Sequence, residues 1–384
     1  MRHDLVVLSP GISRRRKELD QARADGRLVG EVELASWFLS CPLVGVTGTN
    51  GKSTTTSLLA FGFEAAGRRA FAGGNLGRPL STLVSSGEAV DVAVVELSSY
   101  QLESVVRLSL VASTWLNLAP DHLERYGDVD TYALAKRRIA ERTRREGTFV
   151  ANADDRHVAM AAEVTTADVR WFGRSSAGPV AEAGTRISED GRGLRTAAGV
   201  EELYGLEGRA LIGPHNYENA AAAIEVWRSQ RVPPEVVSQA IHDFPGLPHR
   251  LELVATTCGK RWINDSKATN VSAARVALRA VRGRKVLIVG GRRKMEPLDA
   301  LVEAAVAHDV CLVLSIGESA LEFSHAFHSI LPVEAMGTLD AAVERSKEIE
   351  SDVVLLSPAC ASFDQFRDFE HRGDHFRALL RGNT

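Results

Sequence analysis

The sequence predicts an α/β protein with mainly parallel sheets, because short apolar runs alternate with helical patterns along the chain. Each apolar run is rich in β-branched residues and ends in Gly, Ser, Thr or Glu, which is typical of a strand buried on both faces. The predicted strands cover residues 4–9, 43–47, 91–97, 285–291, 310–317 and 352–358. Helical patterns cover residues 53–66, 216–230 and 298–309. In such sheets, ligands gather at the carboxyl ends of the strands.

Length and composition exclude several classes of protein. With 384 residues, 45% of them hydrophobic and 25% charged, the chain is neither disordered, collagen-like nor a coiled coil. The formal charge of −3 gives no basic excess for nucleic acid or an anionic membrane, and no apolar stretch reaches about 18 residues. The four cysteines share no metal-site spacing, so we expect each to be buried and reduced. We therefore expect a cytoplasmic, multidomain protein with no nucleic-acid or membrane partner.

Three segments are predicted. Residues 1–40 hold one strand and a very basic run, 14–17, at the start of a helix. Residues 41–246 begin with a Gly-rich loop and include a Gly- and polar-rich section, 173–212, for which we expect antiparallel strands. Residues 247–384 contain three strand–helix units.

The most informative run is residues 44–56, VGVTGTNGKSTTT, in which a strand leads into a Gly-rich turn and then a helix. Backbone N–H groups of such a turn, together with the helix N-terminus, bind phosphate. Lys52 would reach the β- and γ-phosphates of a nucleotide, and Ser53 or Thr54 would hold Mg²⁺. Val46 stands where the general phosphate-loop pattern has Gly, so a plain turn is the alternative. A Lys-Ser-Thr run at a helix start has no packing reason, which favours the phosphate loop.

Two polar residues follow predicted strands in the central segment. Glu96 lies at the carboxyl end of the strand at 91–97. Its carboxylate can ligate Mg²⁺ beside the phosphate loop or cap the next helix, and the residue alone favours neither. His122 follows the apolar run 111–118 and can bind metal, move protons or cap its loop.

Other polar residues lie on predicted helices. Lys136 belongs to a helix predicted over 131–145, where its arginine neighbours favour a solvated basic face. Asn216 and Asn219 are one turn apart at the start of an Ala-rich helix, where caps are favoured.

The mostly polar run 264–270, NDSKATN, follows a strand predicted over 251–263. It favours a ligand-lined loop over a plain turn with an N-cap.

Several ordered runs resemble the Mur ligases, a family of ATP-dependent enzymes that form amide bonds. They are GTNGKST (48–54), LNLAPDHLERYGDVDTYALAKRRI (116–139), GLPHR (246–250), NDSKATN (264–270), SPACASFDQF (357–366) and RDFEHRGDHFRALL (367–380). The resemblance extends over almost the whole chain and is greatest to the glutamate-adding members. It implies a central phosphate-loop ATPase domain, a C-terminal Rossmann-like α/β domain and a shortened N-terminal Rossmann-like remnant.

The resemblance implies roles for residues of each segment. ATP would contact Gly48, Thr49, Asn50, Gly51, Lys52, Ser53, Thr54, Asn216, Asn219, Arg250, Asp265 and Lys267. Two Mg²⁺ ions would be held by Ser53, Glu96, His122 and Lys136, with Lys136 carbamylated. The UDP-linked substrate would contact Ser9, Pro10, Gly11, Asn75, Ser98, Gln101 and His122. Glutamate would contact Thr269, Lys294, Ser362 and Phe369. Lys52, His122 and Lys136 would serve catalysis.

The implied reaction is the addition of glutamate to UDP-N-acetylmuramoyl-L-alanine through an acyl phosphate, in cell-wall precursor synthesis. D-Glutamate is the expected amino acid, with L-glutamate open, and we expect a monomer that uses ATP and Mg²⁺. A related ligase with another acceptor, such as a folylpolyglutamate synthetase, is one alternative. A non-catalytic nucleotide-binding regulator is the other.

The sequence departs from the family pattern in two places. The upstream half of the N-terminal domain is missing, which should leave unpaired strand edges and an exposed apolar face. We expect an in-frame coding sequence upstream of Met1. In the run 290–296, Arg293 and Met295 flank Lys294, where the family has an acidic or small residue before the lysine and glycine after it.

Overall fold

The structure is a computed structural model, and it folds into two compact units, Met1–Phe244 and Pro245–Thr384. The residues that it describes are 4–9, 11–12, 14, 16–75, 77–174, 179–180, 184–187, 193–196, 203–205, 211, 213–293 and 296–381. The predicted boundary at 40/41 falls within the first unit, and a separate domain of residues 1–40 stays a prediction.

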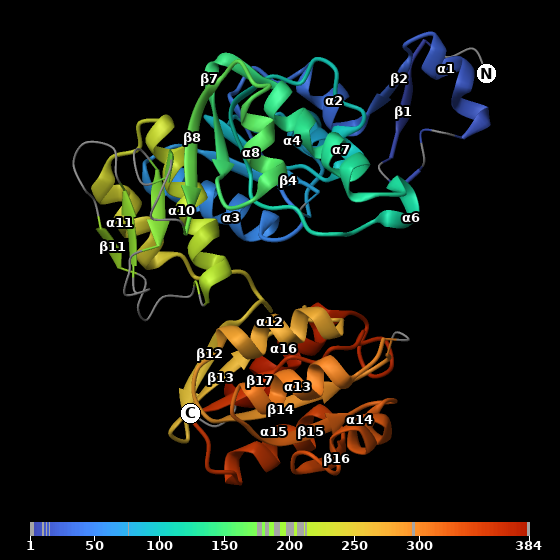
Figure 1. Ribbon diagram of the computed structural model, residues 1–384, viewed down its shortest axis with the longest axis vertical. Coiled ribbons are helices and arrows are strands. Elements are labelled where there is room, and N and C mark those ends of the chain that lie inside the picture. The colour runs from blue at the N-terminus through green and yellow to red at the C-terminus, as the bar shows by residue number, and fades with distance from the viewer. Residues whose placement is uncertain are drawn as a thin grey trace. The chain divides into compact units, whose positions relative to one another are not determined.

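The first unit begins with a two-stranded parallel sheet (Figure 1). Strand β1 (Val6–Leu8) pairs with β2 (Leu28–Gly30), and the short helices η1 (Lys17–Leu19) and α1 (Asp20–Ala24) connect them. The strand predicted over 4–9 is therefore confirmed, but the expectation that it is buried is wrong. Val7 is 49% exposed, because a two-stranded sheet covered by so few helices buries only one face.

A nine-stranded sheet forms the centre of the first unit. Its strands are β3 (Leu43–Thr47), β4 (Ala70–Gly74), β5 (Val92–Glu96), β6 (Leu110–Trp115), β7 (Thr143–Asn152), β8 (Asp168–Gly173), β9 (Thr185–Ile187), β10 (Gly193–Thr196) and β11 (Leu203–Gly205). The strand order is β11-β10-β9-β8-β7-β6-β3-β5-β4. Pairing is parallel from β4 to β9 and antiparallel from β9 to β11, which confirms the antiparallel section expected within 173–212.

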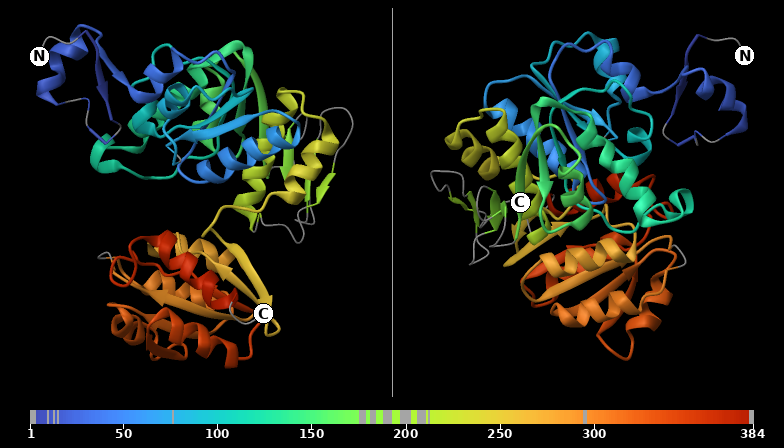
Figure 2. Two further views of the ribbon diagram at one scale, coloured as in Figure 1. Left: turned by 180° about the vertical axis from the view of Figure 1, so that it is seen from behind. Right: turned by 45° about the horizontal axis from the view of Figure 1, so that its top comes forward.

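Helices cover both faces of this sheet (Figures 1 and 2). One face packs against α3 (Lys52–Ala65), α10 (Pro214–Ser229) and α11 (Pro234–Asp243). The other packs against α2 (Glu31–Ser36), α4 (Leu80–Ser86), α5 (Ser99–Leu102), α7 (Val129–Glu141) and α8 (Arg156–Ala162). A short helix, α6 (Leu123–Tyr126), precedes α7.

The helix predicted over 131–145 ends earlier, at Glu141, and β7 starts at Thr143. Thr143 is buried and pairs in register with Leu110 of β6, so sheet pairing prevails over the helical pattern here.

The second unit is a six-stranded sheet with helices on its faces. Its strands are β12 (Glu252–Thr257), β13 (Lys260–Asn264), β14 (Lys285–Gly290), β15 (Val310–Ile316), β16 (Val333–Gly337) and β17 (Val353–Leu356), in the order β12-β13-β17-β14-β15-β16. Its helices are α12 (Val271–Ala280), α13 (Asp299–Ala307), α14 (Ala320–Phe327), α15 (Leu339–Glu348) and α16 (Phe369–Arg381). Only β12 pairs antiparallel.

The single strand predicted over 251–263 is wrong, because β12 and β13 form a hairpin. Cys258 and Gly259 make the turn, both with left-handed φ, at 53° and 70°. Cys258 is exposed and only Cys360 is buried, so the expectation of four buried cysteines is also wrong, although all four are free thiols. No helix in the described part of the chain is long and apolar enough to cross a bilayer.

Candidate active site

The Gly-rich loop lies between β3 and α3, at the carboxyl end of the sheet. Gly51 precedes α3 with a left-handed φ of 84°, and a Cβ there would lie 2.2 Å from the amide oxygen of Asn219. Asn219 on α10 donates to the amide oxygen of Asn216 at 3.1 Å, and both residues are buried. The N-cap of α10 is Gly213, so the interpretation of the two asparagines as caps is wrong. Instead, Asn219 lies against the loop and is hydrogen-bonded to Asn216.

Contacts with the segment after β6 fix the conformation of the loop. The backbone N–H groups of Thr49 and Asn50 donate to the main-chain and side-chain oxygens of Asn117, at 3.0 and 2.9 Å. The amine of Lys52 donates to the carbonyls of Gly48, at 3.0 Å, and Thr49, at 2.8 Å. The Lys52 charge is thus held at the loop, as a phosphate site requires. Ser53 and Thr54, which are also predicted to contact ATP, lie in the first turn of α3.

Glu96 ends β5 beside the loop, and it is 2% exposed. One carboxylate oxygen accepts a hydrogen bond of 2.7 Å from the amide of Asn75, and the other is buried with no hydrogen-bond partner among the described residues. A buried oxygen of this kind calls for a cation or water. The alternative role as a helix cap is wrong, because Ser98 caps α5 in a capping box with Gln101.

Lys136 is buried on α7, so the interpretation as part of a solvated basic face is wrong. Its amine donates to the Gly48 carbonyl at 2.8 Å and to the Thr47 hydroxyl at 3.4 Å. Burial, and secondarily the charge of Lys52, hold the pKa of Lys136 well below its usual value. Its neighbour Arg137 does face solvent, where it pairs with Glu141 at 3.1 Å. Helical geometry therefore separates two adjacent basic residues.

His122 lies between two tyrosine rings near the same loop. Its ring centroid is 5.0 Å from that of Tyr100 and 6.1 Å from that of Tyr132, whose hydroxyl lies 3.4 Å from the Thr49 hydroxyl. His122 precedes α6 with a left-handed φ of 54°, but its side chain makes no capping bond. The imidazole stays partly exposed, with Asp121 at 3.6 Å.

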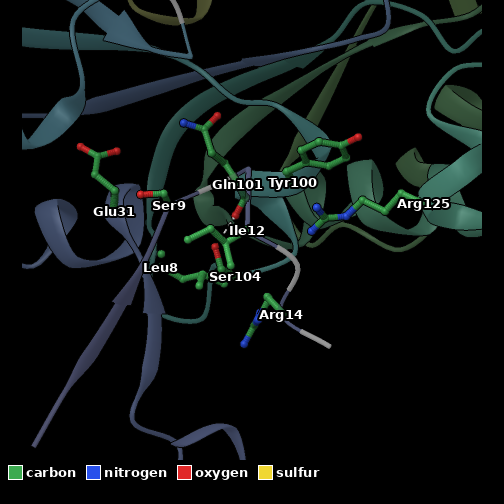
Figure 3. Close-up of a pocket in the computed structure, with 10 residues that line it drawn as sticks. Leu8, Ser9, Ile12, Arg14, Glu31, Tyr100, Gln101, Ser104 and Arg125 are labelled. Carbon is green, nitrogen blue, oxygen red and sulfur yellow. Dashed lines mark hydrogen bonds between the residues drawn. The ribbon is translucent and has the colours of Figure 1, made fainter. Parts of the chain in front are cut away.

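The predicted substrate residues of the first unit separate into different places. Ser9 and Gln101 both line a pocket between β1 and α5 (Figure 3). Asn75 lies at Glu96 instead, and Gly11 is exposed. Pro10 lies outside the described residues.

In the second unit, Asp265 follows β13 and is buried. It accepts hydrogen bonds from the Leu251 N–H, at 3.2 Å, and from the Ser357 hydroxyl, at 2.8 Å. Burial raises the pKa of Asp265 to about 7. Arg250 immediately precedes Leu251 and is exposed.

The remaining predicted residues of this unit lie around α16 and α12. The Lys267 amine is 3.6 Å from the ring centroid of Phe369, so these two residues are in contact. Thr269 is half-buried, and Ser362 is 2% exposed. Lys294 lies outside the described residues. Asn270 does cap α12, accepting from the N–H of residue 273 at 2.8 Å, so the turn and the polar loop are both present.

Comparison with known proteins identifies the chain's relatives. Residues 46–227 match the Mur ligase middle domain, and residues 249–360 match the Mur ligase, glutamate ligase domain. The chain is 46% identical to a protein named UDP-N-acetylmuramoylalanine--D-glutamate ligase from Anaeromyxobacter dehalogenans, over 98% of this chain and 83% of that protein. A protein of the same name from Myxococcus xanthus is also 46% identical, over 98% and 84%. The chain belongs to the Mur ligase family.

Solved structures of other ligases share the fold. A pseudomurein peptide ligase type C from Methanothermus fervidus superposes with a TM-score of 0.64 at 18% identity, covering 99% of this chain and 87% of that one. The UDP-N-acetylmuramate-alanine ligase from Thermotoga maritima gives 0.63 at 19% identity, covering 99% and 86%. The α/β prediction is confirmed, and as a Mur ligase the chain is an ATP-dependent, amide-bond-forming enzyme.

Sequence reasoning missed Arg372, which supports the polar loop of this Mur ligase. It is 1% exposed on α16, and its guanidinium donates to the hydroxyl and the carbonyl of Ser266, each at 2.9 Å, and to the Cys360 carbonyl at 3.0 Å. The sequence could have indicated its burial, because Arg372, Phe376 and Leu380 recur every four residues and so lie on one face of α16.

Proposed function

We propose that the chain joins D-glutamate to UDP-N-acetylmuramoyl-L-alanine, with ATP as the energy source. The observation that carries this proposal is the 46% identity to two ligases of that name over almost the whole chain. The two lysines at the phosphate loop support it, because a merely structural loop needs neither Lys52 nor Lys136 beside it.

The first step is transfer of the γ-phosphoryl group of ATP to the alanine carboxylate, giving an acyl phosphate and ADP. The loop amides from Gly48 to Thr54 and the Lys52 amine bind the phosphates, and Asn216 and Asn219 contact the nucleotide. In the second step, the neutral glutamate amine attacks the acyl carbon and loses a proton, the amide bond forms, and phosphate leaves with the electrons of the C–O bond.

Mg²⁺ would neutralise the charge that develops on the transferring phosphoryl group. The residues at the loop fit this ion, because Mg²⁺ is usually held by one or two carboxylates together with water and phosphate oxygens. The unpaired oxygen of Glu96 is such a ligand, with the Ser53 hydroxyl and His122 as further candidates. Among the described residues no group of three or more His, Cys, Asp or Glu side chains gathers.

Lys136 is proposed to be carbamylated, and it would then hold a second Mg²⁺. In that reaction the neutral amine attacks CO₂, an N–C bond forms, and the amine loses a proton. A lowered pKa favours the neutral amine, and an anionic carbamate would relieve the repulsion between two cations that share the Gly48 carbonyl.

The second unit is proposed to bind glutamate through Thr269, Lys294, Ser362 and Phe369, and to contact ATP through Arg250, Asp265 and Lys267. Ser9, Pro10, Gly11, Asn75, Ser98, Gln101 and His122 are proposed to contact the UDP-linked substrate. We also propose that the enzyme acts as a monomer in the cytoplasm.

Phosphate release by the purified chain with Mg-ATP and UDP-N-acetylmuramoyl-L-alanine tests the proposal, with D-glutamate, L-glutamate or no amino acid added. We expect release with D-glutamate only. Release with L-glutamate only would overturn the stereochemistry, and ATP binding without turnover would indicate a regulator.

The role of Lys136 is tested by a matched pair of variants. We expect Lys136→Ala to lose activity by on the order of 10²–10³-fold, while Arg137→Ala keeps it, because only the first residue lies at the loop. Depletion of CO₂ should lower wild-type activity reversibly. Wild-type activity that does not respond to bicarbonate would refute carbamylation.

A further inference from the structure

The basic run at residues 14–17 has no part in the proposed chemistry, and its described members lie in different environments. Arg14 is half-buried and lines the pocket between β1 and α5. Arg16 and Lys17 are exposed. A run that served only solubility would have no reason to place one arginine inside a pocket.

The pocket is formed by several parts of the first unit (Figure 3). Arg14 comes from the segment after β1, and Arg125 comes from α6. Gln101 lies on α5, and Ser104 follows that helix. Figure 3 shows Arg125 reaching from its helix toward the ring of Tyr100, and the guanidinium carbon lies 3.9 Å from that ring's centroid. The pocket therefore combines two guanidinium groups with hydroxyl and amide groups.

Positive charge exceeds negative charge around Arg14. Its guanidinium and that of Arg138 donate to the same carbonyl oxygen, that of Glu103. The Glu103 carboxylate is already engaged by Arg125, with bonds of 3.1 and 2.7 Å. Burial and the charge of Arg138 lower the pKa of Arg14, which reflects the same crowding of cations.

Glu31 is the acidic side chain among the residues that line the pocket. Glu31 accepts a hydrogen bond of 2.6 Å from the N–H of Ser81, and Figure 3 shows it across the pocket from Arg125. Arg125 thus pairs with the Glu103 carboxylate, whereas Arg14 and Arg138 donate to a neutral carbonyl, and an anion entering the pocket would balance their charge.

We infer that Arg14, together with Arg125, binds the diphosphate of the UDP-linked substrate in this pocket. The inference rests on the proposed function for the identity of that substrate. A guanidinium matches the geometry of phosphate oxygens with two parallel N–H groups, and a half-buried one is weakly screened by solvent. Arg14 supplies a charged hydrogen-bond donor close to the Ser-Pro-Gly run at residues 9–11. That run itself offers only one hydroxyl and backbone groups.

Binding of UDP, UMP and uridine to the full chain, measured by titration calorimetry, tests the inference. Arg14→Ala should weaken UDP binding by about tenfold or more, because a hydrogen bond to a charged group is lost, and it should leave uridine binding unchanged. Arg16→Ala is the matched control, since it removes the same charge from an exposed position two residues away. Equal UDP affinity in the two variants would overturn the inference.

Two further results separate this inference from the proposed function. If the wild-type chain binds no UDP, the UDP-linked substrate itself is refuted. If it binds UDP and Arg14→Ala binds equally well, only the role of Arg14 fails. In the ligase assay, Arg14→Ala should raise KM for the UDP-linked substrate with little change in kcat, and Arg14→Lys should recover part of the loss. A lowered kcat at unchanged KM would contradict a binding role.

Discussion

Glu33 is predicted to be one of the residues that hold the first unit together. It is fully buried on α2, and its carboxylate accepts four hydrogen bonds. One oxygen accepts from the Arg107 N–H, at 2.7 Å, and from the Trp37 indole, at 3.0 Å. The other accepts from the N–H groups of Val106, at 2.9 Å, and Leu108, at 3.1 Å. A single side chain thus ties the segment after α5 to α2.

Replacement of Glu33 by glutamine keeps the shape and removes half of these acceptors. Whichever way the amide is turned, its NH₂ group faces two N–H donors. A hydrogen bond to a charged group contributes about 1.5–3 kcal/mol, so loss of two gives a destabilisation of about 3 kcal/mol or more. For a unit of this size, that corresponds to a fall in Tm of about 6–12 °C.

The assay is urea unfolding followed by tryptophan fluorescence, since four of the five tryptophans lie in the first unit. Hydrogen exchange adds a local measurement, because the amides of residues 106–108 should lose protection in Glu33→Gln. Glu64→Gln is the control, since Glu64 is exposed on α3. A Glu33→Gln variant within about 0.5 kcal/mol of wild type, the range of ordinary surface changes, would refute the reasoning.

Three other predictions follow from single residues. Gly51→Ala should abolish ATP binding in an equilibrium dialysis assay, because its methyl group would meet the buried Asn219 of α10. Gly67→Ala is the control, since Gly67 has a similar φ of 76° with open space around it. This variant should lose only about 1–2 kcal/mol of folding stability and keep ATP binding. Burial raises the pKa of Asp265 from 3.8 to about 7, so the folded unit binds the carboxyl proton of Asp265 more tightly than the unfolded chain does. The contribution of Asp265 to stability therefore falls as pH rises from about 4 to 7. Asp265→Asn should therefore gain stability relative to wild type as pH rises through this window in urea unfolding, and a constant difference would contradict it. Cys258 should react first with a thiol reagent and Cys360 last, because burial raises the pKa of Cys360 to about 11, and Cys258→Ser should abolish the fast phase.

Strands in the middle of the sheets were predictable because both of their faces are buried. β3 and β14 are nearly continuous apolar runs in the sequence, and every residue in them is buried. β16 was missed because it lies at an edge and is half-exposed, so its sequence lacks the apolar run. The β12–β13 hairpin was missed because its turn, Cys258-Gly259, lacks the Asn-Gly or Asp-Gly pair that marks such turns.

The phosphate loop was predictable because its function requires local residue types, glycines and a lysine at a helix start. Lys136 was not predictable from its immediate neighbours, which are also basic. The signal lies in the helical period, since Tyr132, Lys136 and Ile139 recur at the spacing of one helix face and all three are buried. Partners distant in the sequence, such as Gly48, become visible only in the fold.

Four buried charges differ in how their partners balance them. Glu33 and Arg372 each contact several groups of complementary polarity, so burial costs little and the residue serves architecture. Lys136, like Arg372, donates to neutral acceptors, but it shares the Gly48 carbonyl with a second cation, Lys52. Glu96 keeps one carboxylate oxygen unpaired among the described residues. Because an unbalanced buried charge is costly without a ligand, imbalance marks Lys136 and Glu96 as site residues. The same criterion, applied to the arginines around Glu103, marks Arg14.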